Sequence, residues 1–536
     1  MIGIYHHDLR PMVAARKGTI ISSYPNMLRE EPRPRVSSFD DDGPGEKSAF
    51  GPRHDNDHVY IPDISILPTV DECLSTSRLP WVPKRNVLSN HFMEHGYSRH
   101  IDTHFRLLRH DSVEKIRDIN YKAAQEAFLR NAQVSESYLE SSSGHRFFLY
   151  PHVRVEAVVP DEYEGLTLQL SYDCPEALRG RQMYKSTRLE KGMMCSVLQL
   201  DHDTNELCIY YFNIQHRLST HALESRNGHE RRAAVELSLL PHISDQDRWD
   251  IMSIATAIRP NTSMALIEYP RILYAGFGNA LHCLQQMSDF SYSFGQYISP
   301  RQDEYALYHD QKLHVQPPSY SKRPDFTFDL QPLTGKPESQ FSLHDLAKPK
   351  LELSLRHLAE HTTLDRGQAI ALLSSLNREI AFTQGPPGCG KTFLGVALAR
   401  VLLASRPADR KLPVLLVCHT NHALDAFMTG LRDAGVDKLM RVGGASKEEW
   451  TRAINLRGLA REEQYTRGER GDRRRVDVEK DSNFAHLEAW CKGLSGEFLT
   501  GFPCWQHVSS IVEREYPHIH SQLITKASEP RIQALT

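Results

Sequence analysis

A short glycine-rich stretch holds the residues whose types and spacing most directly specify a chemistry. Gly385, Gly390, Lys391 and Thr392 follow the pattern Gly-x-x-x-x-Gly-Lys-Thr, which cradles nucleotide phosphates. The glycines let backbone N–H groups point at an anion, Lys391 can reach the β- and γ-phosphates, and Thr392 offers a hydroxyl to Mg²⁺. Lys391 and Thr392 are therefore the catalytic candidates. The expected nucleotide contacts are Gln384, Gly385, Pro386, Pro387, Gly388, Cys389, Gly390, Lys391 and Thr392.

The flanking elements must place this loop between a strand and a helix. Ile380 to Thr383 is a short apolar strand candidate, and Val414 to Cys418 has the unalternated character of a strand buried on both faces. The helix between them is indicated by apolar residues at helical spacing: Leu394, Ala397, Leu398, Val401 and Leu402. We predict a β-α-β unit with parallel strands. The alternative is a glycine-rich turn with a surface lysine.

Gln368 lies upstream of the loop, near the start of another helix candidate. That helix begins after Asp365, and its apolar stripe consists of Ala369, Leu372, Leu373 and Leu376. A carboxamide has one donor group and one acceptor, which match the N6 and N7 edge of adenine. Gln368 is therefore a candidate base contact, and a solvated glutamine near a helix start is the alternative.

Two polar residues follow the second strand candidate. Thr420 and Asn421 would lie at the carboxyl end of a parallel strand, where ligands gather, and could donate to a nucleic-acid phosphate. Asn421 could instead cap the next helix, and the residues alone do not decide between these roles. Cys418, His419 and His422 approach a metal-ligand set, but a turn at the strand end accounts for them better.

Composition favours a multidomain intracellular protein. The chain has 536 residues, with no apolar run of about 18 residues and no basic-then-apolar leader, so we expect neither membrane insertion nor secretion. Nine scattered cysteines fit a reducing compartment better than a disulfide framework. The net charge is −3, so nucleic-acid binding would depend on a local patch.

Changes of period and composition divide the chain into segments of an α/β, multidomain fold. Ile101 to Ile119 predicts a helix, alternation between 147 and 240 predicts a small antiparallel β-barrel or sandwich, and Ala265 to Met287 suggests an apolar helix. The expected segments are a disordered tail (1–57), a helical region (58–145), a β-barrel-like domain (146–245), a helical stalk (246–295), a linker (296–350), the first part of a parallel-sheet nucleotide domain (351–450) and a charged helical insertion (451–536).

The motifs, taken in order, resemble the first motifs of superfamily 1 helicases of the nonsense-decay type. They are Gln368, the loop from Gln384 to Thr392, then Thr420-Asn-His-Ala-Leu-Asp425 and Arg441-Val-Gly-Gly-Ala-Ser446. Within that group, the chain is most similar to the large zinc-finger-bearing RNA helicases linked to small-RNA silencing and antiviral sensing. The similarity covers about Ile61 to Trp450, including Ile66-Leu-Pro-Thr69 upstream.

The resemblance implies a RecA-like nucleotide domain that binds ATP and Mg²⁺. It implies that Gln368 contacts adenine, and that Thr420 and Asn421 touch the RNA backbone while the barrel helps to grip single-stranded RNA. Silencing-complex proteins are the implied partners, and cytoplasm, nucleus or both are the implied compartments. Two positions depart mildly from the family pattern, Cys389 in place of threonine and Ala426 in place of glutamine.

A third departure concerns catalysis. A motor of this kind needs an Asp-Glu pair after the phosphate loop, to hold Mg²⁺ and activate water, and a second RecA-like domain. The Asp-Glu pairs of this chain, Asp71-Glu72, Asp161-Glu162 and Asp303-Glu304, all precede the loop. Residues 451–536 are instead Arg/Glu-rich, and the arginines could bind RNA or form a solvated face, of which the solvated face is favoured.

Three hypotheses follow. The chain is an amino-terminal portion or truncated product of an ATP-dependent RNA helicase, or a non-enzymatic scaffold that binds RNA or proteins. A different phosphate-loop protein is the third, disfavoured by the lack of an Asn-Lys-x-Asp motif and of an acidic strand after the loop. We assign the chain to the helicase family and predict that, alone, it neither hydrolyses ATP appreciably nor unwinds a duplex.

Overall fold

The computed structural model separates the chain into two compact units. The first comprises Met1–Tyr292 and Arg474–Thr536, and the second comprises Ser293–Arg473. The structure describes residues 43–498 apart from 76–77, 86–88, 130–137, 162–163, 176–177, 179–185, 219–231, 243–260, 288–293, 300–314, 325, 335–341, 344–347, 407–412, 445, 447 and 463–465. The expected tail therefore lies outside the described residues up to position 42.

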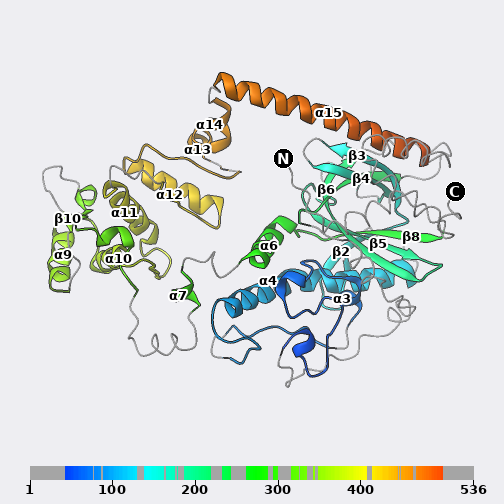
Figure 1. Ribbon diagram of the computed structural model, residues 1–536, viewed down its shortest axis with the longest axis horizontal. Helices are drawn as coiled ribbons and strands as arrows, with labels where there is room; N and C mark the ends of the chain where they lie inside the picture. Colours follow the sequence, from blue (N-terminus) through cyan, green and yellow to red (C-terminus); the bar gives the residue numbers. More distant parts are fainter. Residues whose placement is uncertain are drawn as a thin grey trace. The chain divides into compact units, whose positions relative to one another are not determined.

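An antiparallel sheet of eight strands forms the centre of the first unit (Figure 1). The strands are β1 (Leu139–Glu140), β2 (Arg146–Pro151), β3 (Arg154–Asp161), β4 (Gly165–Asp173), β5 (Met194–Asp201), β6 (Glu206–Leu218), β7 (Arg232–Leu239) and β8 (Thr262–Glu268). Their order is β1-β2-β8-β5-β6-β7-β4-β3, and each neighbouring pair is antiparallel. The antiparallel prediction is confirmed. Within the described residues, however, no strand pairing joins β1 to β3 and closes the sheet into a barrel.

Side-chain alternation gives the sheet two buried faces. On β5, Cys195 and Val197 belong to a cluster with Tyr150 of β2 and Leu170 of β4 on the inner face of the curled sheet. The alternate residues of β5, such as Leu198, point to the other face, where a helix covers them. Because successive strand residues point to opposite faces, one strand serves two cores at once.

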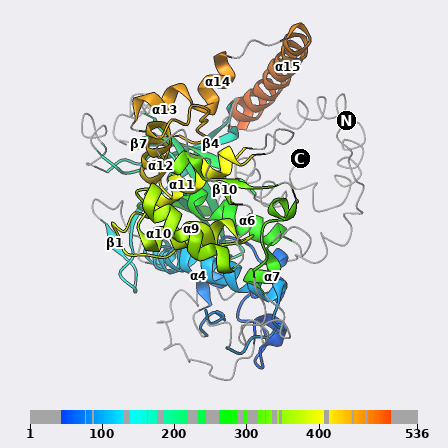
Figure 2. The same cartoon turned by 90° about the vertical axis from the view of Figure 1, so that its left-hand side faces the viewer.

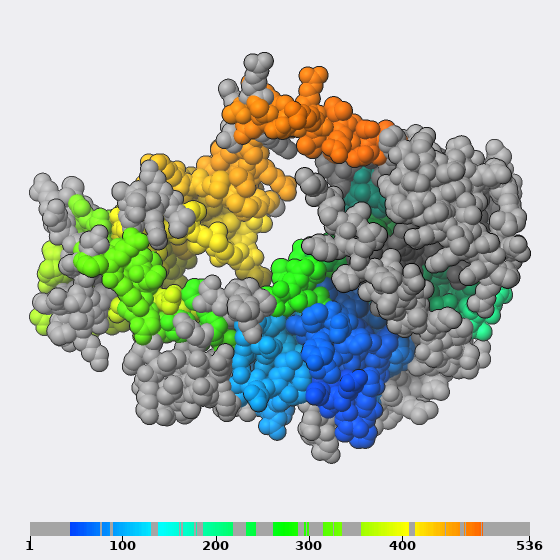
Figure 3. Space-filling view, in the orientation of Figure 1, coloured from blue at the N-terminus to red at the C-terminus, as the bar shows by residue number. Residues whose placement is uncertain are grey.

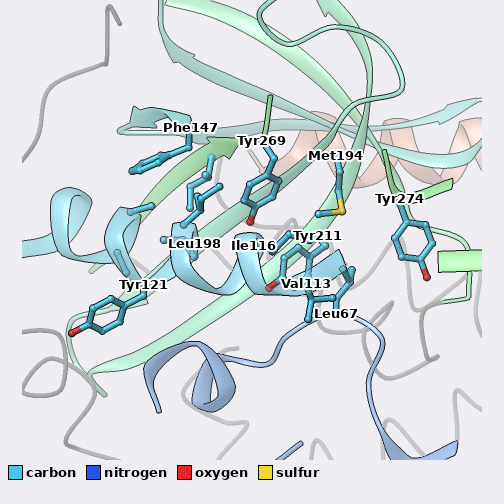
Figure 4. Packing of buried hydrophobic residues seen from close by; sticks show 14 of the residues in the cluster. Leu67, Val113, Ile116, Tyr121, Phe147, Met194, Leu198, Tyr211, Tyr269 and Tyr274 are labelled. Carbon is cyan, nitrogen blue, oxygen red and sulfur yellow. The ribbon is translucent and has the colours of Figure 1, made fainter. Parts of the chain in front are cut away.

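The helix on the outer face is α4 (Tyr97–Ala124), which contains the predicted Ile101 to Ile119. Phe105, Val113 and Ile116 are buried, as their spacing predicts, and Leu108 is partly buried beside them. Figure 4 shows Val113 and Ile116 beneath side chains of the sheet. The helical period and the strand period therefore meet in one apolar layer.

A buried polar cluster links α4 to the sheet. Tyr269 Oη lies 2.5 Å from Asn120 Oδ1 and 2.6 Å from Ser196 Oγ, and the Asn120 amide donates to Tyr211 Oη at 2.9 Å. Tyr211 in turn donates to the Pro68 carbonyl at 2.9 Å. A buried polar group without a partner costs free energy, so this network favours the observed placement of α4 on the strands.

Residues 43–57 differ from the expected disordered tail, since they fold onto the first unit. Arg53 is buried, pairs with Asp57 at 2.9 Å and donates to the Gly43 carbonyl. Asn56 donates to Glu72, which lies on α3 (Val70–Leu74). The segment has few large apolar residues to bury, and polar contacts stabilise its folded position instead.

The expected apolar helix from Ala265 to Met287 is a strand and a shorter helix. Thr262–Glu268 is β8, which pairs with both β2 and β5, and α6 spans Gly278–Gln286. The run Ala265-Leu-Ile is unalternated because β8 is buried on both faces, and periodicity cannot distinguish such a run from a buried helix. Gln285 of α6 donates to the Ile61 and Ile64 carbonyls, which anchors this helix within the first unit.

The second unit is mainly helical. Its larger helices are α9 (Lys348–His361), α10 (Arg366–Leu376), α11 (Lys391–Ala404) and α12 (Asn421–Asp433), which Figure 2 shows side by side. The predicted stripe of α10 and the Leu394, Ala397 and Val401 positions of α11 are buried in one core. Phe328 and Leu330, from the expected linker, belong to the same core, so this stretch is part of the fold.

Short elements complete both units. Phe328 lies in β9 (Phe328–Asp329), which pairs with β10 (Ser342–Leu343). The remaining short helical segments are η1 (Gly45–Lys47), η2 (Ile61–Asp63), the π-turn η3 (Gln125–Leu129), η7 (Tyr274–Gly276), α7 (Gly295–Ile298), η9 (Ser319–Lys322) and η10 (Gln331–Leu333).

The described part of the charged segment after 450 is helical, as expected. Its helices, in chain order, are α13 (Glu449–Ala453), α14 (Leu456–Glu462) and α15 (Arg467–Phe498). The side chains described between 468 and 485 are exposed, and Figure 3 shows atoms of this segment in orange. Residues 499–536 lie outside the described part of the chain.

The two strands expected around the phosphate loop are not formed as strands. Residues 380–383 and 413–418 have no ladder partner among the described residues, and Phe382, Leu415 and Val417 are 86%, 86% and 79% exposed. A β-strand needs a neighbour to satisfy its N–H and C=O groups, whereas a helix satisfies its own. The described residues therefore contain α11, the helix of the predicted β-α-β unit, without the parallel sheet.

Candidate nucleotide and nucleic-acid site

The phosphate loop has the backbone shape that its glycines permit. Gly388 and Gly390 both have φ of +82°, a left-handed conformation that side-chain-bearing residues rarely adopt. Gly390 is the residue before α11, so the helix begins directly at Lys391. Free N–H groups and the positive end of the helix dipole are therefore present at the end of the loop.

Lys391 reaches back over the loop. Its ammonium donates to the Gly385 and Pro386 carbonyls, each at 2.7 Å, and lies 3.8 Å from Cys389 Sγ. A Cβ added to Gly385 would lie 2.5 Å from that sulfur, so the first glycine is needed for a close approach. The cysteine that departs from the family pattern thus packs inside the loop while remaining exposed to solvent.

Gln368, the candidate adenine contact, lies against the loop, and its amide is engaged within the protein. Its backbone N–H donates to Asp365 Oδ1 and its Oε1 accepts from Asp365 N, which together form a capping box at the start of α10. Its Nε2 donates to the Cys389 carbonyl at 3.3 Å. Gln368 therefore connects the α10 cap to the phosphate loop.

The residues fit a nucleoside triphosphate with Mg²⁺. The loop places an ammonium, two left-handed glycines and a helix N-terminus together, and Thr392 is exposed on the first turn of α11. Lys391 would exchange its two carbonyl bonds for phosphate oxygens, and Thr392 would be the Mg²⁺ ligand. Gln384, Pro386 and Pro387 are exposed along the same loop.

Thr420 and Asn421 divide the two roles that the sequence left open. The Thr420 hydroxyl accepts from Ala423 N at 3.1 Å, so Thr420, and not Asn421, is the N-cap of α12. Asn421 is the first residue of the helix and is exposed. Capping is thus the observed role of Thr420, whereas Asn421 Oδ1 accepts from Arg441 Nη2 at 2.8 Å and its NH₂ group can make another contact.

An ion pair that the residue pattern did not single out joins α12 to the segment that follows it. Arg441 Nε donates to Asp425 Oδ1 at 2.9 Å, and the Arg441 side chain has no exposed surface. Both residues belong to the motifs named above. They are 16 residues apart, so helical or strand periodicity could not have predicted that they form a pair. Sequence spacing could have indicated only that each motif contains one charged residue.

The described residues also bear on the cysteine and two histidines that approach a metal-ligand set. No group of three or more His, Cys, Asp or Glu side chains there could hold a metal ion, so Cys418, His419 and His422 do not form such a set. None of the described helices is both long and apolar enough to cross a membrane.

Comparison with known proteins indicates which class of protein this chain is related to. A family model described as an AAA domain matches residues 363–489, from the start of α10 into α15. Together with the similarities below, this match confirms what the motifs indicate: the chain is related to superfamily 1 helicases of the nonsense-decay type.

Three curated relatives define the similarity more closely. The chain is 26% identical to the human NFX1-type zinc finger-containing protein 1 over 428 residues, which are 77% of this chain and 20% of the relative. It is 22% identical to the Schizosaccharomyces pombe Helicase required for RNAi-mediated heterochromatin assembly 1, over 74% of this chain and 33% of the relative. It is 29% identical to the ATP-dependent helicase upf1 of the same yeast, over 21% of this chain and 12% of the relative. The chain thus spans between about a fifth and a third of the length of the first two relatives.

Proposed function

We propose that this chain binds ATP with Mg²⁺ at the phosphate loop. The observation that carries the proposal is the convergence of Lys391, Gln368 and the left-handed Gly390 at the start of α11. Mg²⁺-ATP supplies a phosphoryl group that a competent motor transfers to water. In this chain, Lys391 would neutralise phosphate charge, Thr392 would ligate the ion, and Gln368 would turn its amide from the Cys389 carbonyl to the adenine edge.

We infer a second ligand, single-stranded RNA, at the start of α12. Thr420 keeps a hydroxyl proton free to donate while its oxygen caps the helix, and Asn421 is exposed beside it. Two of the relatives are named as helicases, and one of these is required for RNAi-mediated heterochromatin assembly. These similarities support RNA silencing or RNA surveillance as the setting, with silencing-complex proteins as partners and cytoplasm or nucleus as the compartment. The sheet of the first unit would help to grip the RNA.

The parallel sheet belongs to this proposal as well. Residues 380–383 and 413–418 would become strands of a RecA-like domain when further strands lie beside them, which would bury Phe382, Leu415 and Val417. No Asp-Glu pair follows the loop in this sequence, and such a pair is what would hold Mg²⁺ and activate water. We therefore propose that the chain alone binds ATP and RNA but does not turn ATP over.

A non-enzymatic scaffold is the second candidate, and one observation favours it. Lys391 satisfies its ammonium on two loop carbonyls, so the loop is self-consistent without a nucleotide. In that case, ATP would bind weakly and RNA or protein binding would not depend on it.

The test is nucleotide binding and RNA-stimulated hydrolysis by the purified chain. Titration of a fluorescent ATP analogue should show saturable, Mg²⁺-dependent binding, which Lys391→Ala weakens roughly ten- to 100-fold because charge-assisted hydrogen bonds to phosphate are lost. Lys438→Ala, at another exposed lysine of the same unit, is the matched control.

The outcomes separate the candidates. Saturable binding without multiple turnover supports an ATP-binding but catalytically incomplete chain. Turnover that Lys391→Ala abolishes would overturn the second half of the proposal, and the absence of nucleotide binding would leave the scaffold.

A further inference from the structure

The buried guanidinium of Arg441 contacts the exposed amide of Asn421, at the proposed RNA site at the start of α12. Arg441 Nη2 donates to Asn421 Oδ1 at 2.8 Å, while Nε donates to Asp425 Oδ1 at 2.9 Å. Nη1 donates to the Gly443 and Gly444 carbonyls, each at 3.2 Å. Every nitrogen of this side chain therefore has an acceptor.

Those acceptors are themselves fixed. Ser446 donates to the second oxygen of Asp425 at 2.8 Å, and the Thr451 hydroxyl donates to Ser446 at 2.6 Å. The backbone of Arg441 is held too, because its N–H donates to the Ile454 carbonyl and its carbonyl accepts from Leu456 N. The guanidinium is a rigid fork and cannot turn away from Asn421 without breaking several bonds.

This rigidity determines which way the Asn421 amide faces. A guanidinium has only donors, so Asn421 must present its oxygen to Arg441, and its NH₂ group then points away from the buried side. The exposed end of this amide carries two donors and no acceptor, which suits an anion such as a phosphate. An asparagine without such a partner would present either end.

We propose that Arg441 is a positioning residue that makes Asn421 a hydrogen-bond donor toward the RNA backbone. The inference rests on the proposed RNA site, and it adds that the Arg441 motif acts there through Asn421 without touching RNA itself. Asp425 neutralises the buried guanidinium, so the helix that presents Asn421 also holds its orienting group in place.

A double-mutant cycle tests this coupling. The affinity of the chain for a fluorescein-labelled uridine 20-mer is measured by anisotropy for wild type, Asn421→Ala, Arg441→Lys and the double variant. Each single change should weaken binding roughly three- to tenfold, the worth of one hydrogen bond, and the double variant should bind no more weakly than Asn421→Ala. Losses that multiply would overturn the proposal, because Arg441 would then act independently of Asn421.

The matched control is Arg457→Lys, the same change at an exposed arginine of α14, which should leave RNA affinity unchanged. An equal loss in Arg457→Lys and Arg441→Lys would also contradict a positioning role. It would show that binding responds to any exchange of arginine for lysine.

A stability measurement tests the amide orientation without RNA, and also stands if Arg441→Lys does not fold. Asn421→Asp still accepts from Arg441, so its thermal midpoint should equal or exceed that of wild type, whereas Asn421→Ala should fall below it. An Asn421→Asp midpoint below that of Asn421→Ala would overturn the orientation. If wild type binds no RNA, the proposed function fails at this site while the orientation is still decided by the two midpoints.

Discussion

The two units treat their apolar extended segments in opposite ways. Leu198 in β5 of the first unit has no exposed surface, because β6 and β8 pair with its strand on either side and α4 covers it. Leu415 of the second unit lies in an equally apolar segment and is 86% exposed. Both sequences predict strands, but only the first has lateral partners. A strand's stability is supplied by its neighbours, whereas the helices of the second unit form from local hydrogen bonds and one shared core.

The sharpest test of this comparison is the same substitution in both segments. Leu198→Lys should cost more than about 3 kcal/mol of unfolding free energy, because it buries an ammonium in a packed layer. Leu415→Lys should change the unfolding free energy by less than about 0.5 kcal/mol. Chemical denaturation with hydrogen exchange resolved by unit would measure both. A large loss for Leu415→Lys would show that residues 413–418 are packed in solution.

Charge pairs should differ between the units in the same direction. In the first unit, Arg109 donates to both oxygens of Glu72, at 2.9 and 2.7 Å, and Glu72 is buried. Arg109→Ala would leave that carboxylate without its main partner and should cost about 3–5 kcal/mol. Arg432→Ala on α12, whose ion pair with Asp433 is exposed, should cost less than about 1 kcal/mol. Equal losses, measured by urea denaturation, would contradict the comparison.

The same buried carboxylate predicts a pH dependence of the first unit. Burial alone would raise the pKa of Glu72, but the charge and hydrogen bonds of Arg109, with a hydrogen bond from Asn56, outweigh it and lower the pKa from 4.5 to about 2. A lowered folded-state pKa stabilises the protein above the unfolded value, and this stabilisation is lost as pH falls from about 4.5 toward 2. The difference corresponds to about 3 kcal/mol.

Denaturation of wild type and Glu72→Gln between pH 5 and 2.5 would measure this term. Wild type should lose more unfolding free energy than the variant across that interval. Parallel pH profiles would show that Glu72 contributes nothing to the acid sensitivity.

The smallest expected effect is on a helix cap in the second unit. Thr420→Ala removes the hydroxyl that accepts from Ala423 N and should cost about 1 kcal/mol, with faster amide exchange in the first turn of α12. Thr420→Ser retains the cap and should preserve exchange rates. If the alanine variant exchanges as slowly as wild type, packing and not capping defines the start of the helix.

Local patterns in the sequence were sufficient for the parts of the fold that depend on local contacts. The predicted stripe of α10 is buried at all four positions, and that of α11 is buried at Leu394, Ala397 and Val401 and partly buried at Leu398 and Leu402. The two left-handed glycines of the phosphate loop lie directly before Lys391. Gln368 lies against the loop, while its predicted contact with adenine stays a prediction.

The rest depends on partners distant in sequence. Residues 262–268 became a strand because β2 and β5 flank them, and Arg53 orders its segment through contacts that composition does not reveal. Arg441 stands within a quoted motif, yet its contacts with Asn421 and Asp425 depend on how α12 is placed. The predicted parallel sheet shows the same limit. Residues 380–383 and 413–418 are apolar enough to be strands, but no described strand pairs with them.

The cysteines give this chain a built-in chemical reporter. Burial raises the pKa of the Cys73 thiol to about 12, and raises that of Cys195 as well, so alkylating reagents should reach neither until the first unit unfolds. Cys389 is exposed inside the phosphate loop, within 3.8 Å of the Lys391 ammonium. Cys283 is also exposed, and Cys208 and Cys418 are partly exposed. With these three, Cys491 and Cys504 replaced by serine, rapid labelling would track access to the loop, and slow labelling would time the opening of the first unit.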